Sequence, residues 1–243
     1  MRYFNLLSTL LEAGVVCGAA YIAPQILRYA GAWRLAEICR SKKTLVFTYD
    51  DGPGDELTPA LLELLAAADT QATFFPTGRS ATRNPELLTR VAAAGHEIGC
   101  HSQNHLNAWR STPWRNIRDI DAGYQTLAHW VPHGGLFRPP NGKATLATWW
   151  AVRRRRATFA WWTIDSGDTH AELPAPESVV EQVRRAGGGI VLMHDFDRDQ
   201  KSRAKRHAHV LNVTSKLLEL ARTEGLTVCS FGQLLQDVRP TSM

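Results

Sequence analysis

The segment TLVFTYDDGP, residues 44–53, decides the fold of this 243-residue chain. Its first part, Thr44–Tyr49, is apolar and rich in β-branched and aromatic residues, as strands buried on both faces of a parallel sheet are. Two acids and a Gly-Pro pair follow, so the strand ends in a charged loop. We interpret later runs of the same kind as further strands: Ala72–Thr77, Glu97–Cys100, Gly135–Phe137, Ala157–Ile164, Ile190–Met193 and Leu226–Ser230.

Helical patterns lie between these runs. They are Leu57–Ala67, a helix that begins at Pro85 and ends before Gly95, a long helix from Pro113, and then Ala144–Arg153, Pro176–Ala186 and Val210–Thr223. Strands that alternate with helices predict an α/β fold with a parallel sheet of about seven strands, either a closed barrel or a doubly wound sheet. The longest irregular stretch, Asp195–Ala208, is expected to be a lid or a binding loop.

The pattern predicts a main domain over residues 41–243 and an N-terminal apolar helix over residues 1–40. Hydrophobic residues make up 44% of the chain and charged residues 21%, which is the balance of a globular protein. The four cysteines lie far apart without a C-x-x-C pair, which excludes a disulfide scaffold and a cysteine-rich zinc site.

The N-terminal segment Phe4–Ala23 is mostly apolar and roughly long enough to cross a bilayer, although Glu12 interrupts it. It fits a helix lying on or anchored in a membrane, a cleaved secretory signal, or a helix packed on the domain. If it spans, the positive charges that follow it would keep the main domain in the cytoplasm. We therefore expect a membrane-associated protein with a cytoplasmic domain, and a secreted or periplasmic one after signal cleavage is the alternative.

The chain has a formal net charge of +5, and its basic residues are clustered in Arg153–Arg156 and in residues 201–206. Such runs usually form solvated faces, and the other interpretation is contact with phosphate groups. No recognition motif or stacking-aromatic pattern accompanies them, so nucleic acid is not expected as a partner.

Charged groups and histidines follow the ends of several predicted strands. In chain order they are Asp50, Asp51, His101, His105, Arg138, Asp165, Asp168 and His194. The carboxyl ends of parallel strands meet at one edge of a sheet, which is where the active sites of α/β enzymes lie. The sequence therefore predicts one site at this edge.

Three of these residues suit a metal ion. His101 and His105 are four residues apart, so they are expected to face the same side of a helical turn, and Asp51 adds a carboxylate. Two histidines and one carboxylate leave coordination positions open, as catalytic metal sites do. Zn²⁺ is the default ion for such ligands, with Co²⁺ or another transition metal as alternatives.

The other residues suit acid–base chemistry. Asp50 is placed to take a proton from water that the metal activates. His194 is placed to protonate a leaving amine, and Asp165 or Asp168 would keep it charged. Arg138 is expected to pair with Asp50, fixing its direction and lowering its pKa. Each group alone also fits a structural role, such as a turn pair, a buried histidine or a surface ion pair.

These residues resemble a known family. TYDDGP at residues 48–53 is similar to the T-F-D-D-G-P motif of the polysaccharide deacetylases, the NodB-homology enzymes of carbohydrate esterase family 4. Further resemblances follow in order over Thr44–Phe231: ATFF with Gly78, the GHEIG that leads into His101-Ser102-x-x-His105, Arg138-Pro139-Pro140-Asn141-Gly142, Asp165-x-x-Asp168 and Leu192-Met193-His194.

The resemblance implies a distorted (β/α) barrel that removes an N-acetyl group from an amino sugar in an oligosaccharide, a polysaccharide or a lipid-linked glycan. It makes Asp50 the base, His194 the acid, and Asp51 with His101 and His105 the ligands. Arg138 would orient Asp50. Asp168 would tune His194, with Asp165 as second choice. The N–H of Asn141 would stabilise the oxyanion, beside Pro140 and Leu192 at the substrate.

Three positions depart from the family pattern: Asn141 stands for Tyr, Leu106 for Pro and Thr169 for Trp. None removes a proposed catalytic group, but they alter the pocket. A catalytically silent protein that binds a carbohydrate or glycolipid on the same fold therefore stays open as an alternative. With an apolar N-terminal segment and a basic loop after His194, we favour a phosphate-bearing glycolipid or lipid-linked sugar as substrate.

Overall fold

The computed structural model describes residues 2–197 and 200–236, and it describes the side chains of residues 18–197 and 201–236. The first half of the chain contains α1 (Arg2–Lys42), β1 (Thr44–Asp50), α2 (Leu57–Ala67), β2 (Thr73–Phe75), α3 (Gly78–Arg83), α4 (Pro85–Ala93), β3 (Glu97–Ile98) and α5 (Pro113–Thr126). The second half contains β4 (Leu136–Phe137), the short 3-10 turn η1 (Pro140–Gly142), α6 (Leu146–Arg154), β5 (Thr158–Phe159), β6 (Ile164–Asp165), α7 (Pro176–Ala186), β7 (Gly189–His194), α8 (Gln200–Glu224), β8 (Thr227–Val228) and α9 (Phe231–Gln236).

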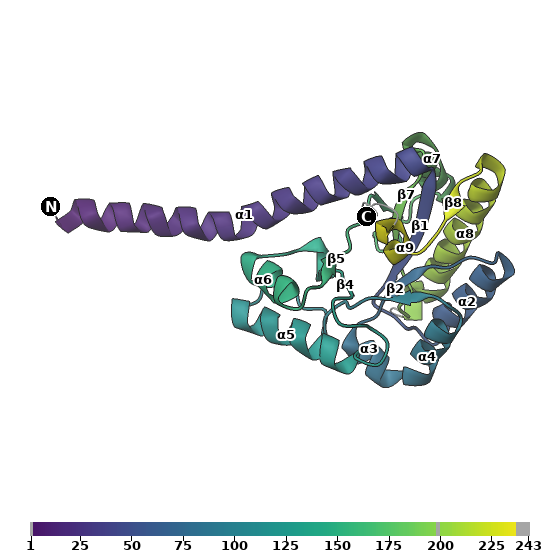
Figure 1. Cartoon of the computed structure of the whole chain (residues 1–243), viewed down its shortest axis with the longest axis horizontal. Coiled ribbons are helices and arrows are strands. Elements are labelled where there is room, and N and C mark those ends of the chain that lie inside the picture. The colour runs from purple at the N-terminus through teal and green to yellow at the C-terminus, as the bar shows by residue number, and fades with distance from the viewer. Residues whose placement is uncertain (1, 198–199, 237–243) are drawn as a thin grey trace, which may run out of the picture.

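The strands form a parallel α/β sheet, which confirms the predicted fold class. They pair in the order β3-β2-β1-β7-β6, and β8 pairs with the start of β1. A single parallel bridge between Cys100 and Phe137 extends this order to β4 and β5. In the described part of the chain no pairing joins β5 to β6, so the barrel-like ring is interrupted there. Helices α2, α4, α5 and α8 surround the strands (Figure 1).

Alternation along the strands separates two cores, because successive side chains of a strand point to opposite faces. On β1, Leu45 and Phe47 belong to the larger core that packs against the helices. Val46 belongs to a smaller core on the other face, which includes Leu35 of α1 and Phe231 of α9. Asp50 is four residues after Val46, so its side chain points to the same face of β1, which we call the inner face.

Two predicted elements have different bounds in the structure. The run Ala157–Ile164 is divided into β5 and β6, since the chain between them crosses from β4 to β7. The expected lid or binding loop over Asp195–Ala208 is wrong for its second half, because α8 begins at Gln200. This first part of α8 is polar, so hydrophobic periodicity does not reveal it.

Helix α1 is a single long helix whose N-terminal end extends away from the rest of the chain (Figure 1). Its C-terminal half packs on the domain and buries Leu35 and Cys39. Of Phe4–Ala23, the side chains before Gly18 lie outside the described residues. Among the residues described, no helix combines the length and the hydropathy that a bilayer crossing requires.

Candidate active site

Strand register brings the proposed base and acid together. Asp50, the last residue of β1, pairs in register with His194, the last residue of β7. Both have inward parity, so their side chains reach the same cavity at the carboxyl edge of the sheet. This cavity has a volume of about 330 Å³. Its lining residues are Asp50, Asp51, His101, His105, Asn141, Gly142, Trp162, Asp165, Thr169, Leu192 and His194.

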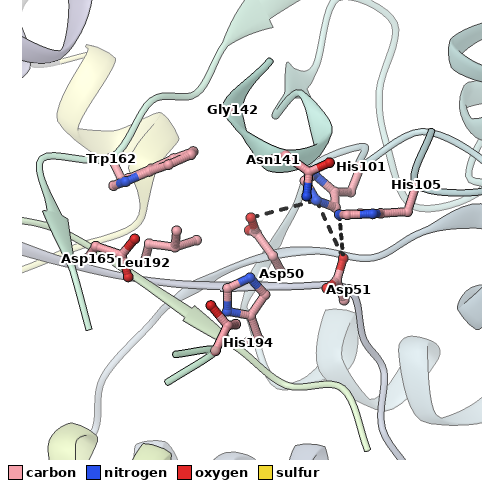
Figure 2. A pocket seen from close by; sticks show the side chains of 11 residues that line it. Asp50, Asp51, His101, His105, Asn141, Gly142, Trp162, Asp165, Leu192 and His194 are labelled. Atoms are coloured by element: carbon pink, nitrogen blue, oxygen red, sulfur yellow. Dashed lines mark ion pairs between the residues drawn. The ribbon is translucent and has the colours of Figure 1, made fainter. Parts of the chain in front are cut away.

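The three predicted metal ligands gather on one side of the cavity (Figure 2). Asp51 Oδ1 lies 3.5 Å from His101 Nε2 and 3.3 Å from His105 Nε2. Ligand atoms about 2.0–2.2 Å from one tetrahedral ion lie roughly 3.4 Å apart, so the three atoms fit a common Zn²⁺-like ion.

The protonation state of His101 also suits a ligand. Its Nδ1 lies 2.7 Å from the carbonyl oxygen of Arg138. A hydrogen bond from Nδ1–H to this oxygen leaves the Nε2 lone pair directed at Asp51. In metal sites, ligand histidines are commonly oriented by such a bond from the ring nitrogen that does not bind the metal. Burial lowers the pKa of His101 to about 3, so the ring is neutral at physiological pH.

The expected helical turn between His101 and His105 is wrong. No helix is present there, and Ser102 and His105 adopt left-handed backbone conformations with φ of 64° and 57°. The buried carboxylate of Asp119 on α5 holds the loop, because its Oδ1 accepts hydrogen bonds from the backbone N–H (3.1 Å) and side chain (2.8 Å) of Asn104. Asp119 therefore positions His105, and the sequence pattern missed this residue.

Arg138 lies beneath Asp50, as predicted. Its Nη1 donates to Asp50 Oδ1 at 2.9 Å and to Thr48 Oγ1 at 2.7 Å, while its guanidinium lies over the Phe75 ring. Arg138 lowers the pKa of Asp50, as expected, but the net shift has the opposite direction. Burial raises the pKa of Asp50, and the charge of Arg138 opposes this only in part. A base with a raised pKa takes a proton more readily than an ordinary aspartate does.

Asp168, rather than Asp165, contacts His194. Asp168 Oδ1 lies 2.9 Å from His194 Nδ1, and Oδ2 accepts from the backbone N–H of His194 at 2.7 Å. Burial alone would lower the pKa of His194, but the charge and hydrogen bond of Asp168 outweigh it and raise the pKa to about 9. Asp165 lies at the cavity wall and accepts from the N–H of Gly167 at 2.9 Å.

Of the three residues predicted to contact the oxyanion or the substrate, Asn141 and Leu192 line the cavity and Pro140 does not. Asn141 lies at the cavity with φ of 55°, and its N–H donates to no other described residue. Pro140 is buried behind it and does not line the cavity, where Gly142 stands instead. Leu192 lines the opposite wall together with Trp162 (Figure 2).

Two further residues shape the site and have no role in the sequence prediction. Asp195 is buried, and it accepts from the N–H of Gly52 at 3.1 Å and from the Thr58 hydroxyl at 2.7 Å. It thereby ties the end of β7 to the loop that carries the two aspartates. Trp162 forms a wall of the cavity, and its place just before β6 and Asp165 is the signal that could have found it.

Comparisons with known proteins agree with this geometry. Residues 37–160 match the polysaccharide deacetylase family model. The chain is 34% identical to a peptidoglycan-N-acetylglucosamine deacetylase of Bacillus cereus, with 82% of this chain and 92% of that protein covered. It is 29% identical to a chitooligosaccharide deacetylase of Azorhizobium caulinodans, with 66% and 77% covered.

A solved structure supports the fold. The family 4 carbohydrate esterase of Streptomyces lividans, determined with acetate, superposes with a TM-score of 0.65 at 26% identity and covers 77% of this chain and 91% of its own. The parallel α/β fold, the acids and histidines gathered at its carboxyl edge and these relatives together define a hydrolase. The chain belongs to the polysaccharide deacetylase family.

Proposed function

We propose that this protein removes the acetyl group from an N-acetylated amino sugar of a glycan or glycolipid. The observation that carries the proposal is the pairing of Asp50 with His194 on neighbouring inward-facing strand ends, beside the Asp51, His101 and His105 cluster. The names of the relatives, which deacetylate peptidoglycan and chitooligosaccharides, support the reaction class.

Each residue contributes one part of an amide hydrolysis. When bound, a divalent cation at the three ligands supplies Lewis acidity, which polarises a carbonyl oxygen and acidifies water. Asp50, fixed by Arg138, accepts the proton of the attacking water. The N–H of Asn141 donates to the oxygen of the acetyl group as negative charge develops on it. His194, charged through Asp168, gives a proton to the leaving amine.

Removing divalent ions is expected to abolish acetate release from N-acetylglucosamine oligosaccharides, and Zn²⁺ or Co²⁺ should restore it. The physical reason is that the Asp-His-His cluster offers a tetrahedral ligand set with a position left open. Metal content should approach one ion per chain and fall sharply in His101→Ala. A matched control is His129→Ala, which removes a histidine outside the cavity.

Two outcomes would contradict the proposal. Full activity after exhaustive chelation would show that the reaction needs no divalent ion. A protein that binds these sugars but releases no acetate with any metal would instead be the carbohydrate-binding protein of the alternative.

We also propose that α1 attaches the protein to an anionic membrane surface. Ile22, Ile26, Tyr29 and Trp33 recur at a spacing of four, three and four residues, and each is more than half exposed. Residues at this spacing form one face of a helix, and basic residues on the same helix complement anionic lipid headgroups. The cytoplasmic placement of the domain stays a prediction.

The double variant Ile22→Asp with Ile26→Asp is expected to lose most of its co-sedimentation with phosphatidylglycerol vesicles. Burial of the two isoleucine side chains in the lipid headgroup region drives binding, so aspartates at the same positions oppose membrane binding. Trp114→Asp, on an exposed residue of α5, is the matched control and should bind like the wild type. Unchanged sedimentation of the double variant would refute the proposal.

A further inference from the structure

One arginine of α1 reaches the wall of the cavity from outside the residues that match the family model. Helix α1 packs closely here, because a Cβ at Gly31 would lie 3.1 Å from the Trp161 ring. One turn earlier on the helix, Arg28 directs its guanidinium to Trp162, with 4.7 Å between Cζ and the ring centroid. A Cβ at Gly142 would lie 3.1 Å from Arg28 Cζ. Gly142 and Trp162 both line the cavity, so Arg28 lies at its rim.

The guanidinium of Arg28 lies over the rings of Tyr29, Trp161 and Trp162. In the part of the chain that the structure describes, it forms no ion pair within 4.0 Å and no hydrogen bond, although a guanidinium has five N–H donors. Burial lowers the pKa of Arg28, and the charge of Asp165 opposes this in part. The charge of Asp165 acts on Arg28 without forming an ion pair, so the N–H donors of the guanidinium stay available to an anionic group of a ligand.

The aromatic contact also fixes the direction of the charge. The guanidinium lies over the face of Trp162 at the rim of the cavity, and its planar fork of N–H groups matches the two oxygens of a phosphate or carboxylate. Lysine lacks this geometry, because its ammonium group is a point charge. The position is therefore suited to an oxyanion group on a sugar that enters between Trp162 and the metal cluster.

We propose that Arg28 binds an oxyanion group, a phosphate or a carboxylate, carried by the amino sugar whose acetyl group is removed. This inference rests on the proposed function, and it makes the substrate an anionic sugar rather than a neutral chain. Arg28 then acts as a specificity residue that α1 adds to the family site. The chemistry of the group is shared by sugar phosphates and by sugar acids, so the test separates them.

The kinetic test compares three acetylated substrates: a neutral N-acetylglucosamine oligosaccharide, N-acetylglucosamine 1-phosphate and N-acetylmuramic acid. Arg28→Gln should lower kcat/KM for the anionic substrates by about tenfold or more, the loss expected for a charge-assisted pair. Arg28→Gln should change kcat/KM for the neutral substrate by less than about twofold. Arg28→Lys should restore part of the loss. Arg34→Gln, an exposed arginine of the same helix, is the matched control.

A binding experiment separates failure of this inference from failure of the proposed function. Titration calorimetry of the full chain with N-acetylglucosamine 1-phosphate, N-acetylmuramic acid and N-acetylglucosamine needs no turnover. Arg28-dependent binding of an anionic sugar without acetate release would keep the inference and reject the deacetylase. Acetate release with equal losses on neutral and anionic substrates in Arg28→Gln would reject the inference alone. The anionic sugar that loses more affinity identifies phosphate or carboxylate.

Discussion

Asp50→Asn is expected to lower kcat/KM for acetate release by about a thousandfold, within the range that a general base contributes. The amide keeps an oxygen for Arg138 but cannot take a proton from water. Because Asp50 is not one of the clustered ligands, the variant should retain its metal. Acetate release and metal content of the same preparation are the measurements.

Asp51→Asn is the matched control, since it changes the neighbouring carboxylate by the same atoms. It should lose metal and activity together, because Asp51 Oδ1 faces both imidazoles. Activity of Asp50→Asn near that of the wild type would exclude it as the base. Loss of metal in Asp50→Asn alone would instead exchange the roles of the two aspartates.

Asp50→Asn is also expected to be less stable than the wild type. Removing the charge of Asp50 leaves Arg138 buried without its ion pair, and breaking such a pair costs about 3–5 kcal/mol. Both partners are nearly inaccessible, so water cannot solvate the charge of Arg138 that is left uncompensated. A lower melting temperature is therefore expected, and activity is compared well below it. A thousandfold loss in a folded, metal-containing variant is then a chemical effect.

The sequence predicted the residues of the site better than the way in which they are held. Strand ends could be read from apolar runs, and parallel strands must bring their carboxyl ends to one edge, so Asp50 and His194 could be placed together. The loop that carries His105 could not be read this way. Asp119 of α5 holds Asn104, which lies between the two left-handed residues, and no local spacing encodes this contact.

The start of α8 escaped the sequence for a related reason. Hydrophobic periodicity detects a helix through its buried stripe, and residues 200–208 lack one. Polar contacts hold this segment instead: Arg206 donates to the backbone oxygens of Asp168 and His170, and Arg203 pairs with Glu56. Such contacts join residues distant in the chain, so they appear only once the fold is known.

His194→Ala is expected to lower kcat/KM on acetamido sugars by a factor similar to that of the base variant, about a thousandfold. The amine of an amino sugar leaves poorly unless it is protonated, whereas a nitrophenolate leaves without help. The loss should therefore be much smaller on 4-nitrophenyl acetate, and comparing the two substrates in the same variant isolates the role of the acid from any change in the cavity. Equal losses on both substrates would contradict the role of His194 as acid.

The pH profile tests how His194 is kept charged. With a pKa of about 9 in the folded protein, the acid form persists at lower pH and activity falls as pH rises through that value. In Asp168→Asn the burial of the ring is opposed only by the weaker charges of Asp50 and Asp51, so the alkaline limb should move to lower pH. Asp165→Asn removes a neighbouring carboxylate that does not contact the ring and should leave the limb in place.

The same pair links stability to pH with a definite sign. Because the pKa of His194 is higher in the folded than in the unfolded state, where it is about 6.5, its contribution to stability is complete below that lower value. The contribution declines as pH rises through about 9. Asp168→Asn should therefore destabilise the protein more at pH 6 than at pH 10, as thermal unfolding at the two values would measure. Equal destabilisation at both would show that Asp168 acts through its backbone hydrogen bond to His194 alone.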